Sequence, residues 1–168
     1  MKDLIIRPGR EEDLPALLEI HNYFVRETAI TFEMEETTLE NRREWLRGFD
    51  ENGPHQMLIA EVEGKLAGYA ASSRYHERPA YARSVMTSVY LHPELKGQGI
   101  GQSLYQALLE ALSASGKVHR AYALVVIPNP ASEHLHQKLG FRETGLLDEA
   151  GYKFGEYHSV RIFERPMD

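Results

Sequence analysis

A short glycine-rich segment between an expected strand and an expected helix constrains the fold of this chain more than any other feature. The segment reads Gly97-Gln98-Gly99-Ile100-Gly101. It follows an apolar strand predicted over Ser84–Leu91 and precedes a helix predicted to run to about Ser115. Alternating glycines let a backbone turn tightly and approach a ligand closely. Because the first N–H groups of a helix lack intrahelical partners and carry partial positive charge, this junction predicts a pyrophosphate site.

Other kinds of glycine-rich turn are alternatives to a pyrophosphate site. Taken alone, the segment is equally compatible with a flexible turn. A Walker loop is disfavoured because no Gly-Lys-Ser or Gly-Lys-Thr follows. A dinucleotide-binding fold is disfavoured too, because it requires a first parallel strand with an acidic partner about twenty residues later. The order of the expected elements does not fit that arrangement.

The size and charge of the chain narrow its class. With 168 residues it can form one compact domain with a core but not two, so a single domain over residues 1–168 is expected. Hydrophobic residues make up 42% and charged residues 26%, a balance typical of globular proteins. A net charge of −6 lacks the basic field of a nucleic-acid binder, so no nucleic-acid partner is expected. An anionic cofactor would therefore be held by local backbone donors.

The absence of cysteine excludes disulfides, thiolate catalysis and cysteine-based metal sites. The N-terminal segment has no apolar stretch of signal-peptide length, and the longest aliphatic run, near Ala121–Ile127, is far too short to span a membrane. We therefore expect a cytoplasmic protein with no membrane partner. The eight histidines are scattered, and His134 and His136 fall on different faces of an expected helix, so no metal site is expected.

The hydrophobic pattern predicts a mixed α/β domain of alternating strands and helices. Thr37 followed by Glu40 has the spacing of a capping box, which places the start of the second helix there. The expected elements are a strand at Leu4–Arg7, helices at Glu11–Tyr23 and Thr37–Phe49, strands at Gln56–Val62, Leu66–Ser72 and Ser84–Leu91, a helix to Ser115, a strand at Ala121–Val126, a helix at Pro130–Leu139, and strands at Phe141–Leu147 and Tyr157–Phe163.

In its surroundings, the glycine segment resembles the signature of the GNAT acetyltransferases. That signature is Arg or Gln, two residues, Gly, one residue, and Gly or Ala; here Lys96 takes the first position and keeps a cation. A second GNAT element is Asn129 followed by a helix that ends in Lys138-Leu139-Gly140-Phe141. The resemblance implies the GNAT fold, a mixed twisted central sheet whose two central strands splay apart, flanked by helices. It also implies that acetyl-CoA binds in the cleft between those strands.

Five further segments resemble the phosphinothricin and methionine sulfoximine acetyltransferase branch, and together they cover nearly the whole chain. They are Ile20–Tyr23, Glu27–Glu33, Arg78–Tyr81, Ser88–Leu91 and Gly151–Gly155. The resemblance implies an N-acetyltransferase that moves the acetyl group of acetyl-CoA to the amino group of a small amino-acid-like substrate. It also implies a homodimer.

The resemblance further implies which residues bind the cofactor. Backbone groups of Val89, Tyr90 and Leu91 would pair with the pantetheine arm as a strand pairs with its neighbour. Asn129 would bond the pantetheine side, and Lys138 would lie near the phosphates unless it is an ordinary surface lysine. The pyrophosphate would be held beside Lys96 by Gly97, Gln98, Gly99, Ile100, Gly101 and Gln102.

The chain departs from the branch at its catalytic carboxylate. The branch carries a Glu two residues before Ser88, where this chain has Met86, and a thioether cannot accept a proton. An Asp of the branch near the C-terminus is replaced by Ser159. His136 lies where the branch places a histidine, and an ordinary pKa near 6.5 suits proton exchange at neutral pH. We expect His136 and Tyr90 to be catalytic; the alternative is a histidine that packs beside the core.

The residues expected to contact the substrate lie in the connection between the strands predicted at Leu66–Ser72 and Ser84–Leu91. Arg78, with Arg74 as a second candidate, would bind a substrate carboxylate, and Pro79, Ala80 and Tyr81 would wall the pocket. The alternative for Tyr81 is a half-buried tyrosine at the edge of a strand, with no role in the pocket. Other candidate bases are Glu27, Glu33, His76 and Glu77.

Two other functions remain open at this point. One is a GNAT enzyme that acetylates a protein or peptide amine, which would need a wide acidic groove. The other is an acetyl-CoA-binding protein that lost its base at Met86 and does not catalyse transfer. Thiol release from acetyl-CoA across a set of amines separates these from the leading prediction.

Overall fold

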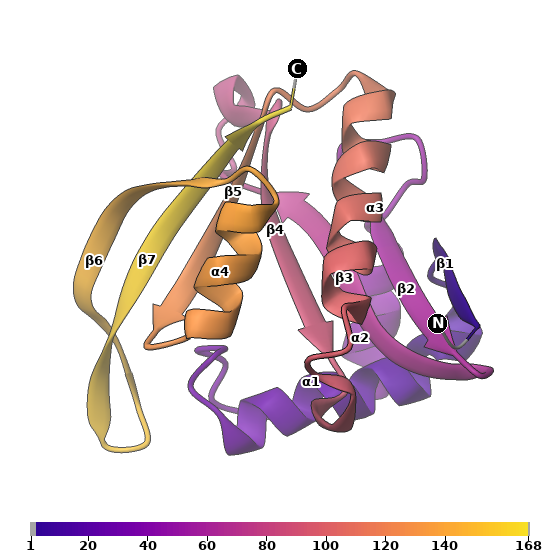
Figure 1. Ribbon diagram of the computed structural model, residues 1–168, viewed down its shortest axis with the longest axis horizontal. Coiled ribbons are helices and arrows are strands. Elements are labelled where there is room, and N and C mark those ends of the chain that lie inside the picture. Colours follow the sequence, from indigo (N-terminus) through magenta and orange to yellow (C-terminus); the bar gives the residue numbers. More distant parts are fainter. Residues whose placement is uncertain (1–2, 168) are drawn as a thin grey trace.

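The computed structural model describes residues 3–167 and contains one open sheet with helices on both faces (Figure 1). The sheet has seven strands in the order β1-β2-β3-β4-β5-β7-β6. Among the strands that residues 3–167 form, β4 and β5 are the one parallel pair. The strands are β1 (Leu4–Pro8), β2 (Met57–Val62), β3 (Lys65–Arg74), β4 (Ser84–Leu91), β5 (Arg120–Ile127), β6 (Arg142–Lys153) and β7 (Glu156–Pro166).

The helices connect these strands in the order that the hydrophobic pattern predicts, which confirms the mixed α/β prediction. The α-helices are α1 (Leu14–Glu27), α2 (Leu39–Leu46), α3 (Ile100–Ser115) and α4 (Pro130–Lys138), and three short 3₁₀ turns are η1 (Glu11–Asp13), η2 (Pro79–Tyr81) and η3 (Pro93–Leu95). None of the helices in residues 3–167 combines the length and the apolar character needed to cross a membrane.

The two central strands separate along their length, as the resemblance predicted. The β4–β5 ladder consists of Ser84 with Arg120, Val85 with Ala121, and Met86 with Tyr122. Beyond Met86 the strands diverge (Figure 1), although β3 stays paired with β4 as far as Leu91. The side of β4 that faces β5 therefore has backbone groups without a strand partner, and such groups seek hydrogen bonds elsewhere.

Two clusters of buried residues lie on the two faces of the sheet. On one face, α3 packs Leu104, Leu108 and Leu112 against the strands, each with none of its surface exposed. Their spacing of four places them on one side of the helix. Burying one leucine contributes roughly 1.5–3 kcal/mol, so this stripe anchors α3 firmly. On the other face, α1 contributes Leu17 and Phe24 to a smaller cluster.

Two helix starts differ from the prediction, for local reasons. α1 begins at Leu14 after the η1 turn, with Pro15 in its first turn, where a missing N–H costs nothing. The N-cap of α2 is Thr38, whose hydroxyl accepts the Asn41 N–H at 3.2 Å. The predicted cap, Thr37, instead donates its own N–H to the Asn22 side chain at 3.0 Å. A tertiary contact with α1 therefore shifts the start of the helix by one residue.

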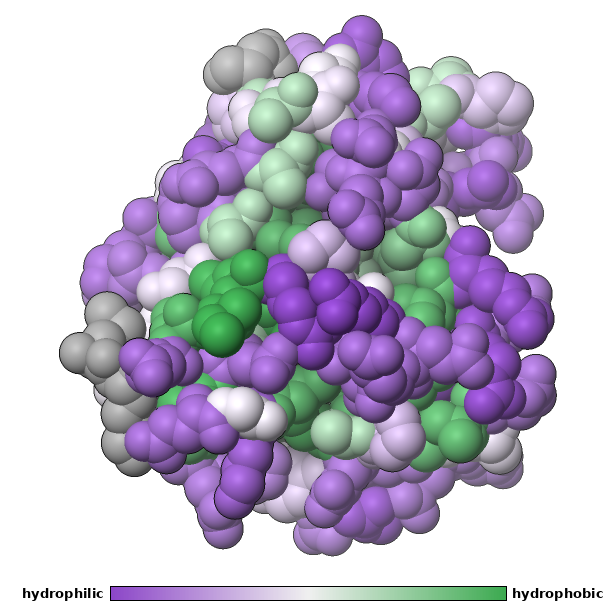
Figure 2. All heavy atoms as spheres, turned by 90° about the vertical axis from the view of Figure 1, so that its right-hand side faces the viewer, coloured by the Kyte–Doolittle hydropathy of each residue, from purple (hydrophilic) through white to green (hydrophobic). Residues whose placement is uncertain are grey.

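The exposed edge of the sheet at β1 is covered by charged side chains. Arg7 contacts Asp13 at 2.8 Å and Glu61 at 2.6 Å. Figure 2 shows this side of the molecule as largely hydrophilic, with apolar residues in separate patches. Charged side chains on an edge strand discourage pairing with another chain, so this edge is protected.

Candidate active site

The glycine loop before α3 has the backbone shape of an anion site. Gly97 and Gly99 have φ angles of 79° and 78°, in the left-handed region that favours glycine. A side chain added at either would meet no atom within 4 Å, so both positions face open space. Gly99 is the N-cap of α3, and the first helical bond runs from Ser103 N–H to its carbonyl at 3.1 Å. The preceding N–H groups therefore have no helical partner.

The other positions of the loop hold it against β4. A Cβ at Gly101 would lie 2.9 Å from Leu91 Cδ1, so the absence of a side chain lets α3 approach the strand. Ile100 is buried in the core beneath the loop. Lys96 is exposed, and its Nζ lies 5.4 Å from the centre of the Phe24 ring. The loop thus combines buried anchors with an exposed, donor-rich and cationic surface.

A cleft opens where β4 and β5 part. Val89 and Tyr90 of β4 form one wall, and residues of β5 form the other. Asn129 lies in the same cleft and caps α4, because its side-chain oxygen accepts the Ser132 N–H at 3.2 Å. Its amide N–H₂ remains available for a ligand. The predicted pantetheine residues are therefore brought together, with Leu91 at the end of the same strand.

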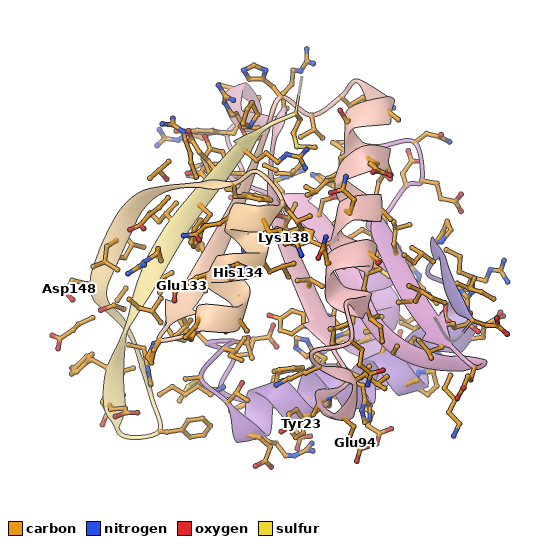
Figure 3. The ribbon with its side chains drawn as sticks, in the orientation of Figure 1. Tyr23, Glu94, Glu133, His134, Lys138 and Asp148 are labelled. Carbon is orange, nitrogen blue, oxygen red and sulfur yellow. The ribbon has the colours of Figure 1, made fainter. Side chains whose placement is uncertain are left out.

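Helix α4 presents different residues to its different sides (Figure 3). Glu133 projects toward β7, where it pairs with Arg161 at 2.6 Å, and His134 faces outward. Lys138 is exposed on the side of α4 toward α3. Within residues 3–167, no three His, Asp or Glu side chains are grouped so as to hold a metal ion.

His136 points inward from α4 and is 4% exposed. Its ring stacks on Phe163 with centroids 5.3 Å apart, and it meets Tyr105 and Phe141 edge-on. The Nδ1–H donates to the Ser132 carbonyl at 2.7 Å, which leaves Nε2 as the unprotonated ring nitrogen. Burial lowers the pKa of His136, although the bond to Ser132 opposes the change. The ring is therefore a neutral base at pH 7.

A chain of hydroxyl groups continues from His136 toward β4. Tyr105 OH lies 3.2 Å from His136 Nε2 and 2.7 Å from Thr87 Oγ1. The Thr87 hydroxyl donates to the Tyr122 carbonyl at 3.1 Å, so it accepts the Tyr105 hydrogen. The lone pair of Nε2 then faces an oxygen with no hydrogen to offer. A proton that reaches Nε2 would find the Tyr105 oxygen as its hydrogen-bond acceptor.

Tyr90 reaches the cleft from the opposite face of β4. Its ring stacks on Tyr69 at 5.3 Å and lies 5.9 Å from the His21 ring. Burial raises the pKa of the Tyr90 phenol, so the group stays protonated at neutral pH and can donate a hydrogen bond. Since Thr87 and Tyr90 point to opposite faces, His136 and Tyr90 approach the cleft from different sides.

A second cavity of about 260 Å³ adjoins this cleft. Its walls come from α1, the α1–α2 connection, α2 and β3, and they include His21, Glu33, Arg42, Trp45 and Tyr69. Ser88 and Tyr90 of β4 border both the cavity and the cleft. The two hollows therefore meet at these two residues, and a ligand in one can reach a ligand in the other.

The residues predicted to bind the substrate lie on the β3–β4 connection. Arg78, Pro79, Ala80 and Tyr81 are all exposed on the β3–β4 connection. Tyr81 contacts the rings of His76 and Tyr75. The centre of the Tyr75 ring lies 4.6 Å from that of Tyr122 in β5. In the described part of the chain, none of the four predicted residues lines either hollow. Tyr81 forms a separate aromatic cluster with Tyr75, His76 and Tyr122, near the point where the central strands part.

The structure shows what surrounds Met86 and Ser159, the two positions at which the chain departs from the branch. Met86 is half-buried in the last β4–β5 pair, so its thioether lies where the strands begin to diverge. Ser159 donates to Asp148 at 3.0 Å and accepts the Glu149 N–H at 2.9 Å. A neighbouring strand thus supplies a carboxylate next to the position where the branch has its Asp.

Sequence reasoning missed Arg42 and Tyr69 as wall residues. Arg42 and Trp45 are three residues apart on a helix, and this spacing places the guanidinium 4.7 Å from the Trp45 ring. His21 gave a signal, because it is polar and lies among leucines on the buried face of α1. Tyr69 gave none, since an aromatic residue in a buried strand is ordinary.

Comparison with known proteins decides the family. The sequence profile of the acetyltransferase (GNAT) family matches residues 17–141, most of the chain. The chain belongs to the GNAT acetyltransferase family. It is accordingly an acetyl-CoA-dependent N-acetyltransferase, as the motifs at Gly97–Gly101 and Asn129 predicted.

Relatives in sequence and structure agree with this assignment. The chain is 48% identical to a phosphinothricin N-acetyltransferase of Streptomyces coelicolor, covering 96% of this chain and 95% of the relative. It is 30% identical to an L-methionine sulfoximine/L-methionine sulfone acetyltransferase of Pseudomonas paraeruginosa, covering 97% and 94%. The structure of a GNAT phosphinothricin acetyltransferase from Sinorhizobium meliloti in complex with acetyl-CoA superimposes with a TM-score of 0.92 at 29% identity, covering 97% and 88%.

The residues of the GNAT cleft fit acetyl-CoA. The open, left-handed Gly97 and Gly99 leave space for a phosphate beside free N–H groups. The unpaired side of β4 offers backbone groups to an extended amide-containing arm, and Asn129 has a free amide group beside it. When bound, acetyl-CoA supplies an acetyl group activated as a thioester.

Proposed function

We propose that this GNAT enzyme acetylates the amino group of a small amino-acid-like substrate, of the phosphinothricin or methionine sulfoximine type, by direct attack of the amine. The observation that carries the proposal is the meeting of two hollows at Ser88 and Tyr90. One hollow has the features of an acetyl-CoA cleft, and the other is a cavity of about 260 Å³ with polar walls. A cavity of this size suits a small molecule better than a folded protein.

The proposed cofactor contacts follow the observed geometry. The N–H groups of the loop from Gly97 to Gln102 bind the pyrophosphate, with Lys96 and Lys138 as flanking cations. The backbone of Val89–Leu91 pairs with the pantetheine arm, and Asn129 donates to it from α4. Unpaired N–H groups of β4 also supply the donors that amide formation needs where negative charge develops on the acetyl oxygen.

The proposed proton path uses His136 and Tyr90 on the two sides of the cleft. Amide formation requires a neutral amine, which loses a proton as the new bond forms. His136 is neutral at pH 7 and its Nε2 is unprotonated, so it accepts that proton through water or through the Tyr105 hydroxyl 3.2 Å away. Tyr90 keeps its proton and donates to the departing sulfur. These roles replace the carboxylate that Met86 has removed.

The homodimer is proposed from an apolar surface on the β6–β7 hairpin. Tyr152, Phe154 and Tyr157 are between 57% and 64% exposed around its tip, which projects beyond the sheet (Figure 1). Clustered exposed aromatics mark interaction surfaces. A partner's hairpin that reaches the Arg78–Tyr81 connection would complete the pocket expected there.

Light scattering at micromolar concentration is expected to return about twice the 19.2 kDa mass of one chain. The double substitution Phe154→Glu and Tyr157→Glu is expected to lower that mass to the mass of one chain, because the new charges would be buried at the interface. The control is Leu39→Glu, at an exposed position that is remote from the hairpin in sequence. A wild-type mass of 19.2 kDa would contradict the dimer.

The acceptor class is tested by thiol release from acetyl-CoA. We expect release with L-methionine sulfone, L-methionine sulfoximine and phosphinothricin, and release at least about tenfold slower with peptides that have a free N-terminus, because a cavity of about 260 Å³ is too small for a longer peptide chain. Faster release with peptides would favour a protein acceptor. Tight acetyl-CoA binding without release for any amine would indicate a binding protein instead.

A further inference from the structure

The side chain of Lys153 is buried, although lysine is among the residues least often found inside a protein. It is 2% exposed and ends β6, directly before the tip of the β6–β7 hairpin. Its Nζ donates to the Val25 carbonyl at 2.8 Å and to the Thr31 carbonyl at 2.9 Å. The same Nζ lies over the Phe154 ring, 5.1 Å from its centre. Two carbonyls and an aromatic face therefore replace the water that this ammonium group has lost.

The turn of the hairpin places Lys153 at these carbonyls. Lys153 pairs with Glu156, and the two residues between them, Phe154 and Gly155, have φ angles of 55° and 80°. Two positive φ angles are typical of a two-residue hairpin turn. A bulky aromatic residue rarely adopts one, so the conformation persists where surrounding contacts hold it. The Phe154 ring against the ammonium group is one such contact, and His158 Nε2–H donates to the Lys153 carbonyl at 3.0 Å.

The two carbonyls belong to the end of α1 and to the connection that follows it, beside which the hairpin lies (Figure 1). Val25 is in the last turn of α1, where carbonyls lack a partner inside the helix and a positive charge is favourable. Next to Thr31, the Phe32 ring packs over Gly151, where a Cβ would lie 2.2 Å from the ring. The hairpin therefore holds the start of the α1–α2 connection at two adjacent points.

The residues around these two points border both hollows of the active site. Ile30 lines the cleft between β4 and β5, and Glu33 lines the second cavity. Burial raises the pKa of the Tyr90 phenol, and the Thr31 side chain, which lies within reach of that phenol, opposes the change. The position of the connection therefore affects the cleft, Tyr90 and the second cavity together.

We propose that Lys153 is a positioning residue for acetyl transfer. Its two bonds hold residues 30–33 in place, so that Tyr90 keeps its neighbour and the two hollows keep their shared wall. Lys153 acts through the α1–α2 connection and not on the reacting atoms. The assignment rests on the proposed function, because it gives Lys153 a role in the transfer that this site is proposed to perform.

Amide hydrogen exchange, followed by mass spectrometry, measures the effect of the two bonds without any reaction. In Lys153→Met a side chain of similar length loses its donors. Peptides that cover residues 28–37 are expected to exchange at least about tenfold faster, the factor that follows from losing a hydrogen bond to a charged group. Peptides of α3 are expected to exchange as in the wild type.

The matched control is Lys65→Met. Lys65 also borders a two-residue turn, formed by Glu63 and Gly64 with φ angles of 52° and 76°. Its side chain is exposed, in contrast to that of Lys153. Residues 28–37 of this variant are expected to exchange as in the wild type.

Thiol-release kinetics measure the effect on transfer. Lys153→Met is expected to lower kcat/KM for L-methionine sulfone at least about tenfold, because the walls that orient the reacting groups shift. Acetyl-CoA affinity is expected to change less than about threefold, because the bonds of Lys153 go to the α1–α2 connection and not to the glycine loop. A residue that only stabilises the fold would lower the midpoint of urea unfolding and leave kcat/KM of the folded enzyme unchanged.

Two results would overturn the assignment. One is a folded Lys153→Met protein whose residues 28–37 exchange as in the wild type, and the other is faster exchange with an unchanged kcat/KM. If the variant does not fold, labelling of the wild-type protein decides. Acetic anhydride is expected to modify Lys153 at least about tenfold more slowly than Lys65, because a buried amine reacts only when the structure opens locally. Equal rates overturn the assignment.

The two measurements separate this inference from the proposed function. If the wild type releases thiol with amino acids but Lys153→Met matches it in exchange and in kcat/KM, only the inference is wrong. If Lys153→Met exchanges faster but the wild type releases thiol with no amine, Lys153 still holds the connection and the proposed function fails.

Discussion

Replacing Gly99 with glutamate is expected to reduce acetyl-CoA affinity by at least about a hundredfold, because like charges brought together in a binding site cost several kcal/mol. Gly99 has a φ of 78°, and its missing side chain faces open space at the N-terminus of α3. A Glu there would place a carboxylate where we propose that the pyrophosphate binds. Titration calorimetry with acetyl-CoA measures the loss.

A matched control separates charge from backbone strain. Gly64, at the β2–β3 turn, has a φ of 76° and also faces open space. Gly64→Glu therefore carries the same conformational cost, roughly 1 kcal/mol, and the same added charge, but away from the proposed site. It is expected to bind acetyl-CoA as the wild type does. Equal affinities for Gly99→Glu and wild type would remove the loop from the cofactor site.

Replacing His136 with alanine is expected to lower turnover at least about tenfold, and up to the roughly hundred- to ten-thousand-fold that general acid–base catalysis supplies. Acetyl-CoA affinity should hardly change, because the ring is proposed to act on the reacting groups and not on the phosphates. Burial lowers the pKa of His136 below its ordinary value near 6.5. The neutral, proton-accepting form therefore persists below pH 6.5, and activity should fall only as the pH drops through that lowered pKa.

Alanine also removes packing against Phe163 and Phe141, so a second variant is needed. His136→Asn can keep the bond to the Ser132 carbonyl while it removes the free Nε2. It should lose turnover as alanine does and retain more stability, which urea unfolding measures. If folded His136→Ala keeps full turnover from pH 6 to 9, then His136 is a packing residue. The base would then be sought among Glu27, Glu33, His76 and Glu77.

Features that depend on neighbours in sequence were predictable. The four-residue spacing from Ile100 to Leu112 identified α3, because side chains four apart share one face of a helix whatever lies beyond it. The alternate glycines identified the turn before it, because left-handed φ angles are a local property of the residue. The family signature at Lys96–Gly101 then extended these local features to the cofactor. The strand boundaries of β4 agreed for the same reason.

Features that depend on contacts across the fold were not predictable. Thr37 has the spacing of a cap, yet Asn22 takes its N–H and Thr38 caps α2 instead. Arg78 matched the branch by position, but only the structure shows that it lies apart from both hollows. Nothing in the sequence distance between His21 and Tyr69 indicates that their side chains meet at 2.8 Å.

The sequence by itself determined the family, the glycine turn before α3 and the order of the elements. These features follow from short-range patterns. A glycine acts through its own backbone angles, and an apolar residue acts through the helix face on which it lies. Only the tertiary structure decided where the second cavity lies and which charged residues line it. Arg42 and Glu33 are ordinary charged residues in the sequence. Both line one cavity because α1 and α2 pack against β3 and β4, and this packing buries Arg42 while Glu33 stays partly exposed.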